Sequence, residues 1–497
     1  MSGRGGDGAT VVASLARSMF AVVRVHVQDV RDGTDGPRIA AQRRMRSRSF
    51  FTKGLVIAFT SLCACAVSDS ADEVASERRI ADRTDAITSI EAEILDFTFD
   101  TEVLADDSVS TRRSIVRQLL YAQGILRLKS DASGQVGNVE LSNVTESRSG
   151  TDGEKKLVRY RAKLPVAWPK KNPPPSSYEL QLPRDATTLA RFNQKYDGYC
   201  GRSEHGQENF WHDWDPRWRD CRVDIGDVVR VRATIGPHEK TNEVKYPEYD
   251  RIWDDGRLDV VAIFGVIESN DADDWGYTEA QRFVQWASDQ LTDVDVTPRR
   301  AGRSILADTT VIGKATVGGQ VRDVKIDVFV VGMIAQAGRD FDQRYDPLSE
   351  RADLILYNGH AQLGANTNAL ARKGNVVPNK YQLVVLNGCE SFALVDTAMV
   401  DRRRDANGAD DPDGTRFLDV ITNAKPGYAN NLANMSYLVY KAALLADTPV
   451  SFTRLIGKMP ESHVVVVWGE EDNKFKPAYS FRHHPAVFAE QSLVFGP

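Results

Sequence analysis

Two chemically reactive side chains follow two similar segments in the second half of the chain. Leu354-Ile-Leu-Tyr-Asn-Gly precedes His360, and Leu383-Val-Val-Leu-Asn-Gly precedes Cys389. Each segment predicts a buried strand that ends in a tight turn, so both side chains are expected at one edge of a parallel sheet. An imidazole beside a thiol can take its proton and so create a strong nucleophile. We therefore predict a catalytic dyad in which Cys389 is the nucleophile and His360 is the base.

The cysteine count supports a special role for Cys389. The five cysteines are Cys63, Cys65, Cys200, Cys221 and Cys389. The first two belong to an export signal, and in an oxidising compartment Cys200 and Cys221 are predicted to form a disulfide. Cys389 remains unpaired. A single His or Cys after a strand is usually structural, but the shared Asn-Gly turn and the unpaired thiol together favour the dyad.

The segment before Cys65 has the character of an export signal. Arg46, Arg48 and Lys53 precede the short apolar stretch 54–59, and Leu62-Cys-Ala-Cys65 resembles a bacterial lipobox. This pattern predicts lipidation of Cys65; the alternative is an ordinary secretory signal. We expect 1–44 to be a doubtful upstream extension, 45–65 the signal peptide, and 66–92 a polar tether.

The bulk composition is that of a globular protein with two or three folded units. The chain has 497 residues, of which 42% are hydrophobic and 27% are charged, and its net charge is −6. This negative charge argues against nucleic-acid binding. We expect no cofactor, and the sequence does not predict an oligomeric state.

Residues 93–245 are predicted to form an α+β N-terminal module. Alternating apolar residues predict strands at 94–99, 139–144, 156–164 and 228–235, and a helix is expected at 111–126. The Cys- and Trp-rich segment 199–221 contains His205 and His212. Their spacing fits no standard metal site, so aromatic packing that stabilises a loop is the expectation for this segment.

Residues 246–497 are predicted to form an α/β domain with a mostly parallel sheet and helices on both faces. Strands are expected at 259–264, 324–331, 354–357, 383–386 and 419–423. Helices are expected at 278–291, 341–351, 391–400 and 434–445, the first capped by Thr278. Gly318-Gly319 predicts a hairpin turn.

With its paired His and Cys segments, the chain resembles the caspase, gingipain, legumain and CHAT superfamily of cysteine peptidases. The resemblance covers roughly 246–468 and includes the order of the elements. It implies a caspase-like fold, endopeptidase activity through a thioester acyl-enzyme, and an oxyanion hole formed by the N–H groups of Ala361 and Cys389. In the family a glycine follows the histidine, so Ala361 is a departure.

The resemblance also gives a meaning to the segment 401–414, which lies where several family members are cut during activation. Oxygen ligands for Ca²⁺ are also present in this segment, at Asp405, Asn407, Asp410, Asp411 and Asp413. A plain solvated loop is the favoured alternative.

These predictions describe an exported enzyme of the bacterial cell envelope, lipid-anchored or secreted. Its expected partners are a protein or peptide substrate and, through the lipid anchor, the membrane, with no nucleic acid. Two alternatives remain: an inactive caspase-fold lipoprotein that acts as a scaffold or binding module, and an amidase or transferase that uses the same Cys–His chemistry.

Overall fold

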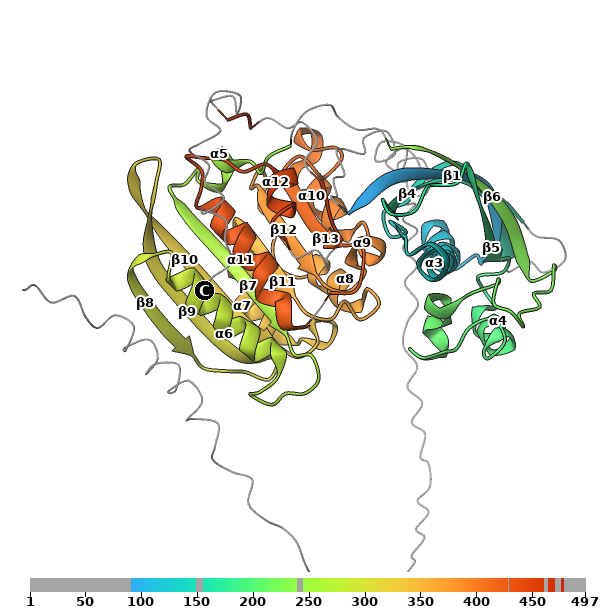
Figure 1. Ribbon diagram of the computed structural model, residues 1–497, viewed down its shortest axis with the longest axis horizontal. Coiled ribbons are helices and arrows are strands. Elements are labelled where there is room, and N and C mark those ends of the chain that lie inside the picture. Colours follow the sequence, from blue (N-terminus) through green and yellow to red (C-terminus); the bar gives the residue numbers. More distant parts are fainter. Residues whose placement is uncertain are drawn as a thin grey trace, which may run out of the picture. The chain divides into compact units, whose positions relative to one another are not determined.

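The protein is a mixed α/β molecule with two β-sheets (Figure 1). The structure, a computed structural model, describes residues 91–148, 155–238, 245–427, 429–459, 464–469 and 475–477. All of these belong to one compact unit, 73–497. The predicted signal, lipidation site and most of the tether lie outside the described residues. Of the helices in the described ranges, none is both long and apolar enough to cross a membrane.

The first sheet lies within the predicted N-terminal module and has the strand order β2-β4-β1-β6-β5, with β3 paired to β4. Its strands are β1 (Ala92–Asp106), β2 (Ser133–Gly134), β3 (Glu140–Arg148), β4 (Lys155–Pro169), β5 (Ser177–Pro183) and β6 (Val228–Pro237). Helix α3 (Thr111–Ser130) begins after Ser110, whose hydroxyl accepts a hydrogen bond from the N–H of Arg113. The predicted strands and helix are confirmed, whereas β5 and the helix α4 (Leu189–Tyr196) were not predicted.

The Cys- and Trp-rich segment forms the predicted disulfide and the predicted aromatic cluster. Cys200 and Cys221 are bonded, and the 3₁₀-helix η1 (Gln207–Asp213) lies between them. Trp214 is fully buried against aromatic rings from α3 and α4. Edge-to-face ring contacts of this kind add to the stabilisation that comes from burial alone.

The second sheet has the strand order β14-β13-β12-β11-β7-β10-β9-β8. Its strands are β7 (Arg257–Gly265), β8 (Thr292–Arg299), β9 (Ile305–Val317), β10 (Gln320–Val331), β11 (Leu354–Asn358), β12 (Gln382–Asn387), β13 (Leu418–Asn423) and β14 (Val465–Gly469). The five strands from β13 to β10 run parallel, and the flanking pairs are antiparallel. Gly318 and Gly319 both have positive φ in the β9–β10 hairpin, as their pairing predicts.

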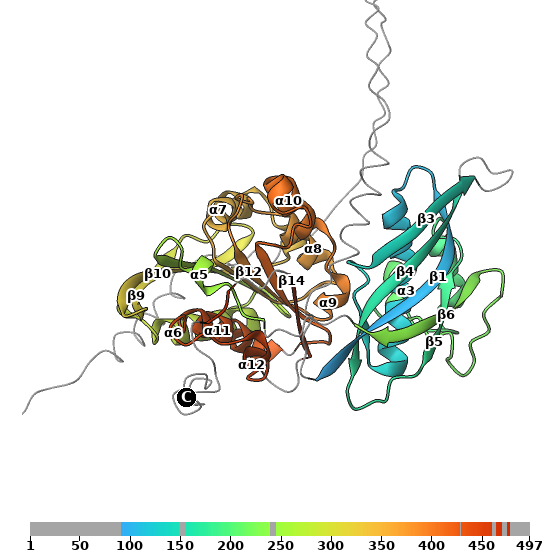
Figure 2. The ribbon, with the colours of Figure 1, turned by 90° about the horizontal axis from the view of Figure 1, so that it is seen from above.

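Helices cover both faces of the second sheet (Figure 2). One face carries α6 (Trp275–Ser288) and α11 (Leu432–Ala443); the other carries α7 (Arg339–Ser349), α8 (Ala365–Arg372) and α10 (Ala398–Asn407). Shorter helices are α5 (Tyr249–Ile252), α9 (Ser391–Leu394) and α12 (Phe452–Ile456). The predicted α/β class with helices on both faces is therefore confirmed. The single helix expected at 391–400 is instead two helices, separated by an extended residue, Val395.

The predicted start of the helix at Thr278 is wrong. Helix α6 begins at Trp275, and the carboxylate of Asp274 accepts a hydrogen bond of 2.7 Å from the N–H of Gly276. The same carboxylate also accepts from the N–H groups of Ile267, at 2.9 Å, and Glu268, at 2.7 Å. These bonds hold the pKa of Asp274 below its usual value against the opposing effect of burial. Asp274 thereby fixes the loop that follows β7.

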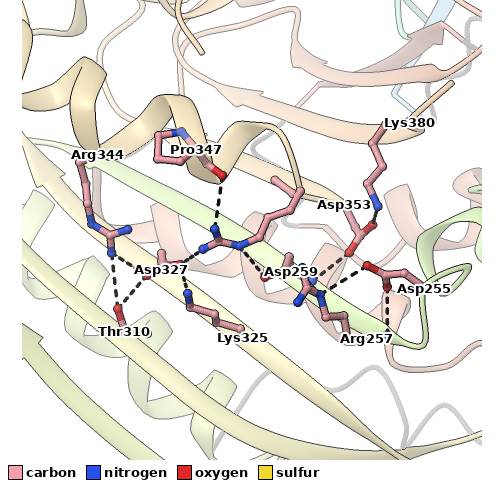
Figure 3. Close-up of polar contacts among 12 residues, drawn as sticks. Asp255, Arg257, Asp259, Thr310, Lys325, Asp327, Arg344, Pro347, Asp353 and Lys380 are labelled. Atoms are coloured by element: carbon pink, nitrogen blue, oxygen red, sulfur yellow. Dashed lines mark hydrogen bonds and ion pairs between the residues drawn. The ribbon is translucent and has the colours of Figure 1, made fainter. Parts of the chain in front are cut away.

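A buried charge network ties α7 to the amino-terminal part of the second sheet (Figure 3). Arg351 lies 3.1 Å from a carboxylate oxygen of Asp259 and 3.3 Å from one of Asp327. Arg344 of α7 lies 2.6 Å from the other oxygen of Asp327. Both carboxylates are nearly inaccessible to solvent, and such groups are tolerated inside a protein only when paired. The network links α7 to the central strands β7 and β10 of the second sheet.

Candidate active site

His360 and Cys389 follow two neighbouring parallel strands at the same level of the sheet. Strand β11 pairs with β12 so that Asn358 lies opposite Asn387. The N–H of Gly359 donates to the carbonyl oxygen of Asn387 at 3.1 Å, which extends the pairing one residue further. Each reactive residue is the second after this asparagine pair. The structure thus brings the two predicted residues to one edge of the sheet.

This edge is also the point where the strand order reverses. After β7 the chain forms the β9–β10 hairpin on one side of β7 and then places β11 on the other side. In open α/β sheets such a reversal leaves a crevice beyond the carboxyl ends of the strands. His360 follows β11 and Ile267 follows β7, so these two residues lie on the two sides of the reversal.

The ring of His360 is held across that reversal. Its Nε2 atom lies 2.8 Å from the backbone carbonyl oxygen of Ile267. A carbonyl oxygen can only accept, so Nε2 carries the hydrogen and Nδ1 keeps a free lone pair in the neutral ring. The backbone oxygen of His360 accepts from the hydroxyl of Tyr357 at 2.6 Å and from the amide of Asn366 at 2.9 Å. Both the backbone and the ring of His360 are therefore anchored.

Three buried asparagines join the carboxyl ends of three adjacent strands. Asn387 donates from its amide to the side-chain oxygen of Asn358 at 3.1 Å, and Asn423 donates to the side-chain oxygen of Asn387 at 2.7 Å. Asn358 also accepts from the hydroxyl of Ser436 on α11, at 2.9 Å. All three asparagines are at most 1% exposed. This asparagine ladder holds β11, β12 and β13 at a common height just before the reactive turns.

Two glycines allow the turns to approach closely. Gly359 has a φ of 157°, and a Cβ atom there would lie 3.0 Å from the Cα of Gly265. A Cβ on Gly388 would lie 3.0 Å from the backbone nitrogen of Ala361 and 3.0 Å from the carbonyl oxygen of Gly359. A larger residue at Gly388 would press on the His turn, and one at Gly359 would press on the end of β7. The Cys turn therefore packs directly on the His turn.

Cys389 is the free cysteine of the described residues and is partly exposed. Burial raises the pKa of its thiol above the usual value, and the negative charge of Glu390 adds to this rise. The backbone N–H of Gly427 and the residue's own N–H act in the opposite direction. No hydrogen bond joins His360 to Cys389 in the described residues, which is common for catalytic pairs before substrate binds.

The two N–H groups predicted to form an oxyanion hole are located in the contacting turns. Within the described ranges, neither Ala361 nor Cys389 donates its N–H to a backbone carbonyl oxygen. The N–H of Cys389 instead interacts with the thiol of the same residue. Ala361 is only 1% exposed, and its methyl group belongs to an apolar cluster with Ala393 and Leu394. The methyl group of Ala361 is therefore buried in a core, and little of the residue is open to solvent.

Glu390 connects the reactive turn to the disulfide-closed segment, a feature that sequence reasoning missed. It is 4% exposed and adopts a left-handed conformation with a φ of 54°. Its two carboxylate oxygens lie 3.7 Å from Nε of Arg127 and 3.6 Å from Nε2 of His212. A buried carboxylate beside the nucleophile was not predicted, because nothing in the local pattern shows which side chain will meet another segment.

The acidic segment 401–414 is mostly helical, whereas a plain solvated loop was the favoured expectation, with a processing loop or a calcium site as the alternatives. Asp405 and Asn407 lie in α10, and Asp410 lies in the 3₁₀-helix η3 (Gly408–Asp410). Asp411 is 1% exposed and accepts hydrogen bonds from the N–H groups of Thr415 and Arg416. In the described residues the carboxylates of Asp405, Asp410, Asp411 and Asp413 form no group of three with converging oxygens. The segment is mostly folded because its aspartates satisfy backbone donors.

A pocket of about 220 Å³ borders the loop that follows β13. Its polar lining includes Asp131, Lys170, Lys171 and Lys425, and neither His360 nor Cys389 lines it. Lys425 belongs to the same loop as Gly427, whose N–H faces the Cys389 sulfur. The loop after β13 therefore separates this basic pocket from the reactive thiol.

Comparison with known proteins finds no family model that matches the chain and no curated protein that is similar to it.

Proposed function

We propose that the protein is an exported cysteine endopeptidase with a caspase-like fold. The observation that carries the proposal is the pairing of β11 with β12, which brings His360 and Cys389 to one edge of the sheet. The contact of Nε2 with the Ile267 carbonyl supports the tautomer that leaves a lone pair on Nδ1, the atom required of the base. A base with a free lone pair beside an unpaired thiol is the minimum arrangement for nucleophilic acyl transfer.

The order of the parallel strands supports the proposed fold class. Starting from β7, the chain adds β10 on one side and then β11, β12 and β13 on the other. A final antiparallel strand, β14, closes the edge. His360 follows β11 and Cys389 follows β12. The resemblance to the caspase–gingipain superfamily rests on this order of strands and reactive residues.

The proposed reaction begins when Nδ1 of His360 accepts the thiol proton and Cys389 Sγ attacks the substrate carbonyl carbon. The N–H groups of Ala361 and Cys389 hold the oxygen while it carries negative charge. The C–N bond then breaks, the amine leaves with the proton from His360, and a thioester remains. Water, deprotonated by the same nitrogen, attacks the thioester and releases the acid and the thiol. No oxidant or metal enters the balance.

The decisive experiment is covalent labelling of the purified protein with peptidyl electrophiles that carry different P1 residues. A peptidase should react at Cys389 with a strong dependence on the peptide, and His360→Ala should slow the reaction. Labelling at the same slow rate by every peptide, with no hydrolysis of peptide libraries, would contradict the proposal.

A catalytically inactive scaffold is the second candidate, and two observations favour it. Burial raises the pKa of the Cys389 thiol, which opposes formation of the nucleophilic thiolate. Ala361 is almost inaccessible to solvent, which limits the approach of a substrate carbonyl. Peptide-independent labelling, together with intact folding, would support this scaffold.

We also propose that the protein is held at the cell envelope by a lipid on Cys65. The disulfide between Cys200 and Cys221 is compatible with a location outside the cytoplasm. Cys65→Ser should release the mature protein from membranes in a fractionation experiment. Unchanged membrane association of this variant would contradict lipidation without bearing on the catalytic proposal.

A further inference from the structure

Three side chains with metal-binding atoms converge in the disulfide-closed segment 200–221, and none of them belongs to the reactive pair. They are His205, His212 and Asp213, and one ligand atom from each lies within 4.8 Å of the other two. Nδ1 of His212 lies 3.3 Å from one carboxylate oxygen of Asp213, and Nδ1 of His205 lies 3.6 Å from the other. We propose that this cluster is a binding site for a divalent transition-metal ion, with Zn²⁺ as the ion that its ligands suit best.

The separations fit the coordination of zinc. With Zn–N and Zn–O bonds near 2.1 Å, adjacent ligand atoms of a tetrahedral site lie about 3.4 Å apart. The two His–Asp separations, 3.3 Å and 3.6 Å, are close to that value, and they run to the two different oxygens of the Asp213 carboxylate. Two imidazoles and one carboxylate also match the preference of Zn²⁺ for nitrogen and oxygen donors, whereas Ca²⁺ and Mg²⁺ favour oxygen alone.

A second observation points to a missing ligand. Oδ2 of Asp213 is buried yet accepts no hydrogen bond in the part of the chain that the structure describes. A buried carboxylate oxygen without a donor is costly, and a bound cation would remove that cost. His212 is 11% exposed in its side chain and Asp213 is 13% exposed, so these two ligands are rigidly placed. His205 is 45% exposed and can rotate to complete the site.

The far side of His212 carries the contact that metal-binding histidines usually make. When Nδ1 binds the ion, Nε2 must carry the hydrogen, and this atom lies 3.6 Å from a carboxylate oxygen of Glu390. A carboxylate behind a ligand histidine orients the ring and strengthens its binding. That Glu390 oxygen also has no hydrogen-bond partner among the described residues. Glu390 is thus a positioning residue for the proposed metal site.

Arg127 opposes metal binding and gives the proposal a sharp test. One of its terminal nitrogens lies 3.2 Å from Nδ1 of His212 and 3.6 Å from Asp213. The guanidinium therefore contacts the ligand atoms that the metal would take. It can withdraw without losing every partner, because it also donates to the backbone oxygen of His212 at 2.6 Å and lies near Glu390. Removing its positive charge should strengthen metal binding, which a merely structural cluster would not show.

The site was not predicted because its residues have no regular spacing. His212 and Asp213 are adjacent at the end of the 3₁₀-helix η1, and His205 reaches them through a turn at Gly206, whose φ is 91°. The Cys200–Cys221 disulfide closes the segment around this turn. Spacing rules for zinc sites describe ligands on one helix or hairpin and therefore do not detect this arrangement.

The test uses the full chain, purified without a polyhistidine tag and freed of metal by a chelator. Equilibrium dialysis against Zn²⁺ should give one ion per wild-type chain, and Co²⁺ should give the visible absorption of a tetrahedral site. His212→Ala and Asp213→Asn should each weaken binding by more than tenfold, and Glu390→Gln by about tenfold. Arg127→Gln should tighten it by about tenfold, the usual size of an adjacent-charge effect in a partly buried site.

Two controls separate this site from other sources of binding. Glu204→Gln changes an exposed carboxylate in the same segment and should leave the affinity unchanged. Cys389→Ala removes a thiol that could bind Zn²⁺ by itself. This variant should still bind one Zn²⁺ ion per chain. Circular dichroism of each variant checks folding. Wild-type protein that binds no Zn²⁺, or binding that survives His212→Ala and ignores Arg127→Gln in folded protein, would overturn the proposal.

Discussion

The Nε2 atom of His360 lies 2.8 Å from the backbone carbonyl oxygen of Ile267, so the loop after β7 determines which ring nitrogen carries the hydrogen in the neutral ring. That loop is fixed in turn by Asp274, which binds the N–H of the same Ile267 at 2.9 Å. A backbone carbonyl cannot be protonated or mutated away, and so it is a stable anchor for one tautomer. The proposed base thus depends on the loop after β7 as much as on its own strand.

The first prediction concerns the dyad. Cys389→Ala and His360→Ala should each remove nearly all peptide hydrolysis, and the double variant should be little worse, because the two groups act as a unit. Both residues lie in turns at the strand ends, so the free energy of unfolding should change by less than the about 2–5 kcal/mol of a large core truncation. Hydrolysis rates and urea unfolding measured on the same preparations check both statements. Additive losses of activity would contradict the shared role.

The second prediction concerns the asparagine ladder. Asn387→Ala removes the acceptor of the Asn423 amide and one of the two donors to the side-chain oxygen of Asn358, so the buried amide N–H group of Asn423 loses its partner. We expect the free energy of unfolding to fall by about 1–3 kcal/mol. We also expect slower labelling of Cys389 by peptidyl electrophiles, because the ladder aligns the ends of β11 and β12, which precede the turns of His360 and Cys389. Asn375→Ala, at an exposed position, should change stability by less than about 0.5 kcal/mol. Equal effects of the two substitutions would show that the ladder has no special role.

The buried strands of the second sheet were predictable because their side chains are apolar on both faces. Runs such as Val-Val-Ala-Ile-Phe264 in β7 have no helical period and are long enough only for a strand. The strand pairing then follows, and with it the proximity of His360 and Cys389. The ladder also had a visible signal, because three predicted strands each end in asparagine, but the sequence does not show that the three amides bond to one another.

The remaining features depend on contacts that no local pattern encodes. Thr278 with Gln281 has the pattern of a capping box, yet Asp274 caps the helix because its carboxylate also satisfies the loop after β7. The partner of His360 is a backbone carbonyl, which every residue carries and no residue type marks. Glu390 and His212 are brought together by long-range packing between segments distant in sequence.

The third prediction is a pH dependence of stability that originates at Asp353, part of the network in Figure 3. Burial raises the pKa of Asp353 from 3.8 to about 7, although Lys380 acts in the opposite direction. The folded protein therefore binds a proton at Asp353 between about pH 4 and about pH 7 that the unfolded chain has released. This group's contribution to stability is present at low pH and is lost as the pH rises through that window.

Asp353→Asn tests this contribution because the amide cannot ionise. Between about pH 5 and about pH 7, the wild-type free energy of unfolding should fall relative to that of the variant, by up to about 1.4 kcal/mol per pH unit. Urea unfolding across this range measures the difference. For Asp405→Asn, at an exposed position, the free energy of unfolding should change with pH as it does in wild type. A constant difference between Asp353→Asn and wild type at every pH would contradict the raised pKa.

The fourth prediction concerns the disulfide, whose two cysteines are 21 residues apart in sequence. Replacing both cysteines by serine should lower the free energy of unfolding by about 3 kcal/mol, because the unfolded chain without the cross-link has a higher conformational entropy. Urea unfolding of the variant and of the oxidised wild type gives this difference. Reduced wild-type protein should match the double variant. Equal stability of the oxidised and reduced forms would show that native packing, not the bond, holds the segment.

The last prediction concerns the charge beside the nucleophile. After burial, the negative charge of Glu390 is a cause of the raised pKa of the Cys389 thiol. Glu390→Gln removes this charge with little change of shape, so the thiol pKa should fall. At a fixed pH below that pKa, a larger share of the protein carries the thiolate, and alkylation by iodoacetamide should be faster by about two- to tenfold.

The measurement is the alkylation rate of Cys389 as a function of pH, with Glu350→Gln as an exposed control that should react at the wild-type rate. Since Glu390 also faces Arg127, thermal unfolding must show that the variant is folded. A rate that is unchanged or slower in folded Glu390→Gln would mean that the charge of Glu390 does not reach the thiol, and that burial alone sets its pKa.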